Sequence, residues 1–124
     1  MNLVDSSAWL EYFANGPNAG FFASAAEETG KLLVPTICLL EVFKRVLQQR
    51  SEGPALRVVG QMQQGKVVDL DSSLALSAAQ ISLDTKLPLA DSVILATARA
   101  YGAVIWTQDA DFAKVKGVKY AAKQ

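Results

Sequence analysis

Short apolar runs alternate along this chain with longer stretches in which apolar positions recur at helical spacing. Five runs predict strands, the last of them a short edge strand, at residues 3–4, 31–34, 66–70, 103–106 and 118–120. The intervening stretches predict helices at residues 7–14, 19–29, 35–50, 55–64, 74–83 and 88–101. Short, continuously apolar strands that alternate with helices indicate a three-layer α/β/α sandwich around a mainly parallel sheet of four to five strands.

Turn-forming residues mark the predicted element ends. Asp5 or Ser6 is placed to cap the first helix, and the cluster at 15–18 ends it. Gly30 predicts the end of the second helix, and the segment 51–54 separates the next two helices. No repeat or linker interrupts the pattern, so residues 1–124 are expected to form a single domain.

The composition narrows the range of functions. Hydrophobic residues make up 51% of the chain and charged residues 19%, which suits a packed core. The 12 basic and 12 acidic residues give a formal net charge of zero, so a polyanionic partner must be met by a local patch of charge. The chain shows neither a secretory leader nor an apolar run of transmembrane length, and a cytoplasmic protein without membrane contact is the expectation.

Histidine is absent, and Cys38 is the single cysteine. This excludes a histidine-dependent triad, histidine-containing zinc sites, an internal disulfide and cysteine-cluster metal sites. Cys38 lies in an apolar stretch and is expected to be a small core residue.

Four acidic residues stand next to or inside apolar segments. Asp5 closes the first strand, Asp109 follows the fourth, Glu41 lies in the helix after the second, and Asp91 lies in the first turn after Pro88. Carboxylates are rarely buried unless they are paired or coordinate a cation. Because ligands bind at the carboxyl ends of parallel strands, these four are expected to converge at one edge of the sheet.

Without histidine or a thiolate ligand, a cation held there is expected to be Mg²⁺ or Mn²⁺. Such a site supports in-line displacement at phosphorus. Asp5 and Asp91 are the expected main ligands, and Glu41 and Asp109 would complete the shell or orient the nucleophile.

Each acid also has a simpler interpretation. Asp5 can cap the first helix, and Glu41 can pair with Arg45 one turn later. Asp109 and Asp111 can be turn residues. These alternatives remain open for each residue taken alone.

Asp91 differs because it projects from an apolar stripe. Its helical neighbours include Ile94 and Leu95, whereas Ser92 and Arg99 form the expected polar face. A simple response to the helix dipole is therefore a weaker interpretation for Asp91 than a ligand role.

Three segments together resemble PIN-domain proteins: 4–10 (Val-Asp-Ser-Ser-Ala-Trp-Leu), 87–98 around Asp91, and 106–112 (Trp-Thr-Gln-Asp-Ala-Asp-Phe). Length and spacing are similar to VapC-type toxins of type II toxin–antitoxin pairs. The resemblance implies a PIN fold, metal-dependent endoribonuclease activity on RNA, inhibition by a cognate VapB-type antitoxin, and a homodimer.

Carried over residue by residue, the resemblance assigns the candidate catalytic quartet to Asp5, Glu41, Asp91 and Asp109. Ser6 matches a small hydroxyl residue that orients the first acid, and Thr107 matches a threonine beside the last acid. Family members differ in the placement of that final acid. Asp109 is preferred here because it is nearer the strand end, with Asp111 as the alternative.

RNA binding requires cations, and the candidates are Lys44 and Arg45 after Glu41 together with Lys86 and Arg99, which flank the Asp91 helix. A solvated charged face is the simpler interpretation of any one of them. The many aromatics between residues 9 and 22 suit the core, or in part a surface for a dimer mate or antitoxin.

Two other functions compete. A phosphoacceptor receiver domain would also bind Mg²⁺ at acidic residues, with Asp69 as its best middle-strand aspartate. A PIN-like RNA-binding module without catalysis is the third possibility.

Overall fold

The computed structural model describes residues 1–124 as a five-stranded sheet with helices on both faces. The strands are β1 (Asn2–Val4), β2 (Leu32–Pro35), β3 (Lys66–Val68), β4 (Val104–Thr107) and β5 (Lys119–Tyr120). Their order is β3-β2-β1-β4-β5, and every neighbouring pair is parallel. The predicted fold class is therefore confirmed, with a fully parallel sheet of five strands.

Six helices connect the strands, with 3₁₀ turns η1 (Thr29–Lys31) and η2 (Ala110–Phe112). They are α1 (Ser6–Phe13), α2 (Ala19–Glu27), α3 (Thr36–Gln49), α4 (Glu52–Met62), α5 (Ser72–Thr85) and α6 (Leu89–Tyr101). None is long and apolar enough to cross a membrane.

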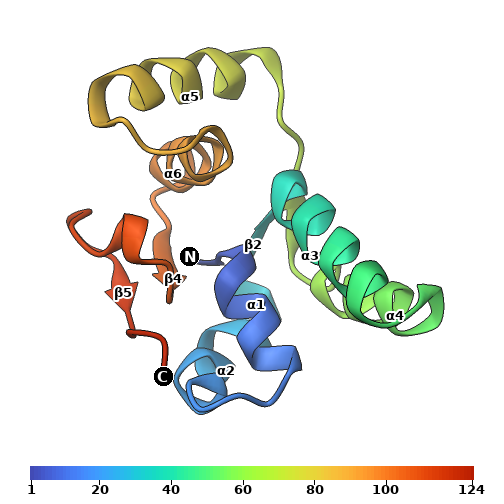
Figure 1. Cartoon of the computed structure of the whole chain (residues 1–124). Helices are drawn as coiled ribbons and strands as arrows, with labels where there is room; N and C mark the ends of the chain where they lie inside the picture. The colour runs from blue at the N-terminus through green and yellow to red at the C-terminus, as the bar shows by residue number, and fades with distance from the viewer.

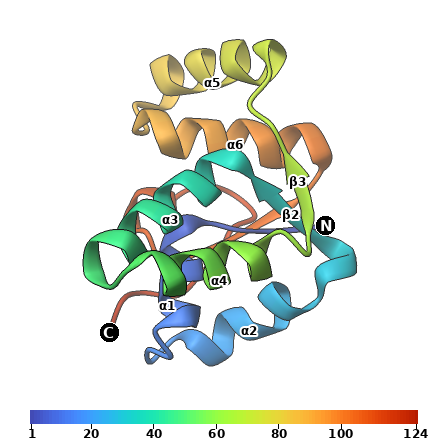
Figure 2. The same ribbon diagram turned by 90° about the vertical axis from the view of Figure 1, so that its right-hand side faces the viewer.

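The direction of the strand order fixes the layers. From β1 to β2 to β3 the chain moves toward one edge of the sheet, and from β3 to β4 it returns past β1. Since parallel crossovers are right-handed, this reversal places α5 and α6 on the face opposite to the earlier helices. Figures 1 and 2 show α5 and α6 stacked on one side of the sheet, with α1 and α2 on the other.

The core forms where both helical layers meet the sheet. Its largest fully buried side chains include Trp9, Phe22 and Phe112, and Cys38 is fully buried as expected. Trp9 and Phe22 are buried core residues. Phe21 contacts the ring of Trp106 but remains 42% exposed to solvent. The aromatic-rich segment is thus mainly core, and a partner surface at Phe21 stays a prediction.

Several element ends differ from the sequence prediction. Helix α4 begins at Glu52, three residues earlier than expected, because Pro54 lies in its first turn, where no backbone N–H is needed. Helix α2 ends at Glu27, before the 3₁₀ turn that contains Gly30. Strand β3 ends at Val68, two residues earlier than expected, because its one partner β2 ends at Pro35, the residue paired with Val68.

Candidate active site

The site lies where the strand order reverses. Strand β1 is followed along the sheet by β2 on one side and β4 on the other, and such a switch point opens a crevice at the carboxyl ends of the strands. Asp5 follows β1 directly, and its backbone N–H donates to the Trp106 carbonyl of β4. Asp109 lies two residues beyond β4, so the two acids flank the same crevice.

Asp5 is buried to 2% exposure and hydrogen-bonded through both carboxylate oxygens. Oδ1 accepts from the Ala8 N–H at 2.9 Å and from the Ser7 hydroxyl at 2.8 Å. Oδ2 accepts from the Thr107 hydroxyl at 2.6 Å. Asp5 therefore caps α1, which is the simpler interpretation drawn from the sequence, and it also lines the crevice. The two roles are compatible in one side chain.

Thr107 connects the two halves of the site. Its fully buried hydroxyl donates to Asp5 and accepts from the Asp109 N–H at 2.9 Å. One side chain thereby fixes the carboxylate after β1 relative to the backbone after β4.

Glu41 reaches the crevice from the second turn of α3 and is held by Ser6. The Ser6 hydroxyl donates to Glu41 Oε1 at 2.7 Å, so Ser6 orients this acid and not Asp5 as the resemblance implied. The hydroxyl that bonds Asp5 belongs to Ser7, the next residue in the first turn of α1. Glu41 forms no ion pair with Arg45, because the one salt bridge in the structure joins Lys31 to Glu28.

Asp91 lies in the first turn of α6, half-buried beside Ile94 in the same crevice. Its neighbour Ser92 was expected on a polar face but is fully buried, since its hydroxyl donates back to the Pro88 carbonyl at 3.0 Å. Short hydroxyl side chains in a helix can bond their own backbone in this way, which removes the need for solvent.

Three aspartates come closest together. One carboxylate oxygen from each of Asp91, Asp109 and Asp111 lies within 4.8 Å of the others. Asp109 caps η2 by accepting from the Asp111 N–H at 2.9 Å, and this cap turns both side chains toward α6. Asp109 and Asp111 were treated as alternatives for one position, whereas the structure places both beside Asp91.

The crevice is an open cleft of about 710 Å³ lined by all four members of the quartet, Asp5, Glu41, Asp91 and Asp109. Burial, followed by the charges of Asp109, Asp111, Asp5 and Glu41, raises the pKa of Asp91 to about 7. Burial likewise raises the pKa of Asp5 to about 6, although its three hydrogen bonds act in the opposite direction. The crowding of carboxylates is therefore unfavourable at neutral pH without a counter-charge.

This crowding predicts the pH dependence of the metal-free protein. The folded-state pKa values of Asp5 and Asp91 lie above the ordinary value of 3.8, so the folded state binds more protons than the unfolded state between these values. Stability should consequently fall as the pH rises through about 4 to 7, with Asp5 contributing on the order of 3 kcal/mol.

Thermal unfolding in EDTA should thus show a higher melting temperature near about pH 5 than near about pH 7.5. Adding Mg²⁺ at the higher pH should restore stability, because an ion that binds only the folded state stabilises it. A melting temperature that rises with pH in EDTA would contradict the crowding.

The donor set fits a hard divalent cation. Every candidate ligand is a carboxylate oxygen, and neither a thiolate nor an imidazole is present in the cleft. Asp91, Asp109 and Asp111 are placed to hold the ion directly. Asp5, which the sequence predicts with Asp91 as a main ligand, accepts two hydrogen bonds at Oδ1 and one at Oδ2, so Oδ2 keeps a lone pair for an ion.

The predicted RNA-binding cations divide into two groups. Lys44 and Arg45 line the cleft, one turn beyond Glu41. Lys86 and Arg99 do not line it. Lys86 ends α5 with a left-handed backbone (φ 63°), and Arg99 lies two turns of α6, or about 12 Å, beyond Asp91, where it lines a separate pocket. Lys86 and Arg99 are therefore close to Asp91 in sequence but do not lie at the site.

The receiver alternative fails on topology. Asp69 follows β3, which is an edge strand of the sheet, and its side chain is exposed. A phosphoacceptor aspartate would need to follow a central strand and meet the other acids.

Two buried amides near the site carried no signal in the sequence. The Gln108 N–H donates to the Ser7 hydroxyl at 3.2 Å, and its side-chain oxygen accepts from Asn18 at 3.1 Å. Asn18 also donates to the Ala122 carbonyl at 2.9 Å. The network ties three distant segments to the hydroxyl that holds Asp5, and only the fold brings them together.

Known structures share this architecture. A chain of a toxin–antitoxin complex from Klebsiella pneumoniae is similar with a TM-score of 0.79 and 21% identity, over 95% of each chain. A sarcin-ricin-loop-cleaving VapC toxin from Mycobacterium tuberculosis has a TM-score of 0.79 at 16% identity, over 96% of this chain and 98% of its own. A DNA-bound VapBC complex from Salmonella typhimurium contains a chain with a TM-score of 0.74 and 18% identity, over 98% of both.

At these identities the likeness shows a common fold. No curated protein matches the sequence. The family model described as "PIN domain" matches residues 3–118, which include most of β1, strands β2 to β4 and the five carboxylates Asp5, Glu41, Asp91, Asp109 and Asp111. The chain therefore belongs to the PIN domain family.

Proposed function

We propose that the chain is the toxin of a type II toxin–antitoxin system, an endoribonuclease that requires Mg²⁺ or Mn²⁺. The observation that carries the proposal is that one carboxylate oxygen from each of Asp91, Asp109 and Asp111 lies within 4.8 Å of the others, beside a cleft lined by Asp5, Glu41, Asp91 and Asp109. Membership of the PIN domain family supports the nuclease chemistry. The similar chains found in toxin–antitoxin and VapBC complexes support the toxin role and a VapB-type antitoxin partner.

A bound divalent ion would supply positive charge to the scissile phosphate and make a water molecule more acidic. The residues of the chain then have separate tasks. Asp91, Asp109 and Asp111 would hold the ion, and Thr107 keeps Asp5 aligned beside them. Ser6 holds Glu41 by Oε1, which leaves Oε2 able to accept a proton from the attacking water.

The direct test is RNA cleavage by the purified chain, freed of any antitoxin. We expect cleavage of cellular RNA with Mg²⁺ or Mn²⁺ and none in EDTA, because the clustered carboxylates lack their counter-charge without metal. Induced expression should arrest growth, and Asp5→Ala and Asp91→Ala should relieve the arrest. RNA binding without cleavage under all metal conditions would instead indicate a non-catalytic module.

The proposal includes a homodimer, which sedimentation of the purified chain would detect. A monomer at micromolar concentration would remove the dimer from the proposal and leave the nuclease chemistry unaffected.

A further inference from the structure

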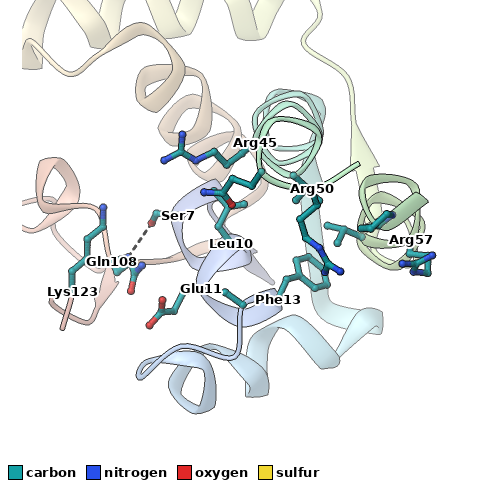
Figure 3. Close-up of a pocket in the computed structure, with 14 residues that line it drawn as sticks. Ser7, Leu10, Glu11, Phe13, Arg45, Arg50, Arg57, Gln108 and Lys123 are labelled. Carbon is teal, nitrogen blue, oxygen red and sulfur yellow. Dashed lines mark hydrogen bonds between the residues drawn. The ribbon is translucent and has the colours of Figure 1, made fainter. Parts of the chain in front are cut away.

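A second cleft adjoins the acidic one. It has a volume of about 460 Å³ and lies between α1, α3, α4 and the C-terminal segment (Figure 3). Ser7, Leu10 and Arg45 line both clefts, so the two lie side by side. A ligand that occupies the acidic cleft and extends past Ser7 can therefore continue into this second cleft, which we call the basic cleft.

Four cations line the basic cleft: Arg45, Arg50, Arg57 and Lys123. Figure 3 shows Arg45 and Lys123 on either side of Ser7, with Arg50 and Arg57 toward the other end. None of the four has a carboxylate within salt-bridge distance, since the single ion pair of the structure lies elsewhere. Their charges are consequently available to an external anion.

Glu11 is the one acid in the basic cleft, and it is already engaged. Its Oε2 accepts from the Asn18 backbone N–H at 2.8 Å. The basic cleft therefore carries a clear excess of positive charge, although the whole chain has a formal net charge of zero.

A polyanionic substrate can enter the acidic cleft only if positive charge lies nearby. Its carboxylates repel a polyanion, and the neutral chain provides no overall attraction to offset this repulsion. Cations next to the cleft can supply the attraction locally, by neutralising phosphates that flank the reacting one.

The basic cleft also offers apolar surface. Leu10, Phe13 and Val58 are partly buried residues of its lining. The Phe13 ring is stacked on Trp9 with centroids 5.4 Å apart, so its orientation is fixed from behind. Apolar and aromatic surface beside cations suits unpaired nucleotides, whose bases can turn away from the strand and stack.

We propose that the basic cleft holds the backbone of single-stranded RNA on one side of the scissile bond, with Arg50 and Arg57 binding phosphates. The proposal rests on the ribonuclease function and adds to it the path of the substrate and the residues that determine its affinity. Bases of the same strand contact the apolar surface around Phe13.

The test measures binding without cleavage. A fluorescent single-stranded RNA of about 12 nucleotides is titrated with the full chain in EDTA, at several salt concentrations, by anisotropy. The groove variant is Arg50→Gln/Arg57→Gln. The matched control is Lys86→Asn/Arg99→Gln, which removes the same charge from exposed sites outside both clefts, with asparagine chosen for the left-handed backbone at Lys86.

We expect the groove variant to lower affinity at least about tenfold at low salt and to reduce the salt slope by about 1.4, or 0.7 per lost phosphate contact. The control should stay close to the unmodified chain. Equal losses in the two variants, or none in either, would overturn the proposal. All four side chains are exposed, and equal melting temperatures would verify that each variant is folded.

A fluorescent decaglutamate peptide tests the other class of occupant. Peptide binding that depends on Arg50 and Arg57, with RNA binding unchanged in the groove variant, would assign the cleft to an acidic protein segment and overturn the RNA proposal. Because the binding assay contains no metal, its result is independent of the nuclease test. Cleavage by the groove variant with an unchanged KM would overturn the basic cleft as an RNA path and leave the nuclease function intact.

Discussion

Asp91→Asn is expected to abolish most RNA cleavage while making the metal-free protein more stable at neutral pH. The carboxylate lies with Asp109 and Asp111, and burial together with these charges raises its pKa to about 7. Asparagine removes one of the repelling charges, so the folded state gains stability. It also removes a proposed ion ligand, and kcat should fall by about 10²–10³-fold, the range for losing one group that stabilises transition-state charge.

Single-turnover cleavage and thermal unfolding in EDTA measure the two effects on the same sample. The matched control is Asp69→Asn, which removes an equal charge from an exposed position after the edge strand β3. The control should cleave RNA at the normal rate, which would also show that Asp69, the residue required by the receiver alternative, has no part in the reaction. An Asp91→Asn protein that cleaves at the normal rate, or that melts at a lower temperature, would show that Asp91 serves the fold and not the metal.

Phe112→Ala should have the largest effect on stability, a loss of about 3–5 kcal/mol. Phe112 is the fully buried last residue of η2, a turn that Asp109 caps and that contains Asp111, and both acids lie beside Asp91. Small domains are stabilised by about 5–15 kcal/mol in total, so the alanine variant is close to unfolding.

Phe112→Leu separates packing from function. The smaller change should keep the fold but loosen the turn, and the stabilisation gained from a fixed Mg²⁺ concentration should decrease. Urea unfolding with and without Mg²⁺ provides both numbers. Leu83→Ala, at a side chain that is 77% exposed, is the control and should change stability by less than about 0.5 kcal/mol. Unchanged Mg²⁺ stabilisation in Phe112→Leu would show that the acidic turn is not held by its core anchor.

The grouping of acidic residues at one edge of the sheet could be predicted from the sequence, because it follows from a single rule of parallel sheets. In a parallel sheet the carboxyl ends of the strands face one way, so residues directly after strands, such as Asp5 and Asp109, must lie at one edge. The same rule works for Glu41, which follows β2 through the start of α3. These placements need only the alternation of strands and helices.

The hydrogen-bond partners of individual side chains within a helical turn could not be predicted by this rule. Whether Ser6 or Ser7 bonds Asp5 depends on the direction in which each side chain leaves the first turn of α1, and two adjacent serines give no periodic signal. The burial of Ser92 depends on a bond to its own backbone, which hydropathy does not register.

The cations of the basic cleft could be identified only from the tertiary structure. Arg50 and Arg57 lie far from Asp91 and Asp109 in sequence, at the end of α3 and in α4, and line the same cleft as Ser7 only because α3 packs beside α1 and α4 packs on α3. Lys86 and Arg99 show the converse, since they are close to Asp91 in sequence and remote from the cleft. A net charge of zero concealed this separation of a negative cleft from a positive one.

The central position of β1 has a consequence for synthesis of the protein. This strand is translated about 100 residues before β4, which is one of its two neighbours in the sheet. Asp5 therefore cannot meet Thr107, Asp109 or Asp111 while the chain is still being translated through its middle. The nascent polypeptide is unable to bring these carboxylates together until residues 107–111 have emerged, so the proposed metal site forms long after β1 has been made.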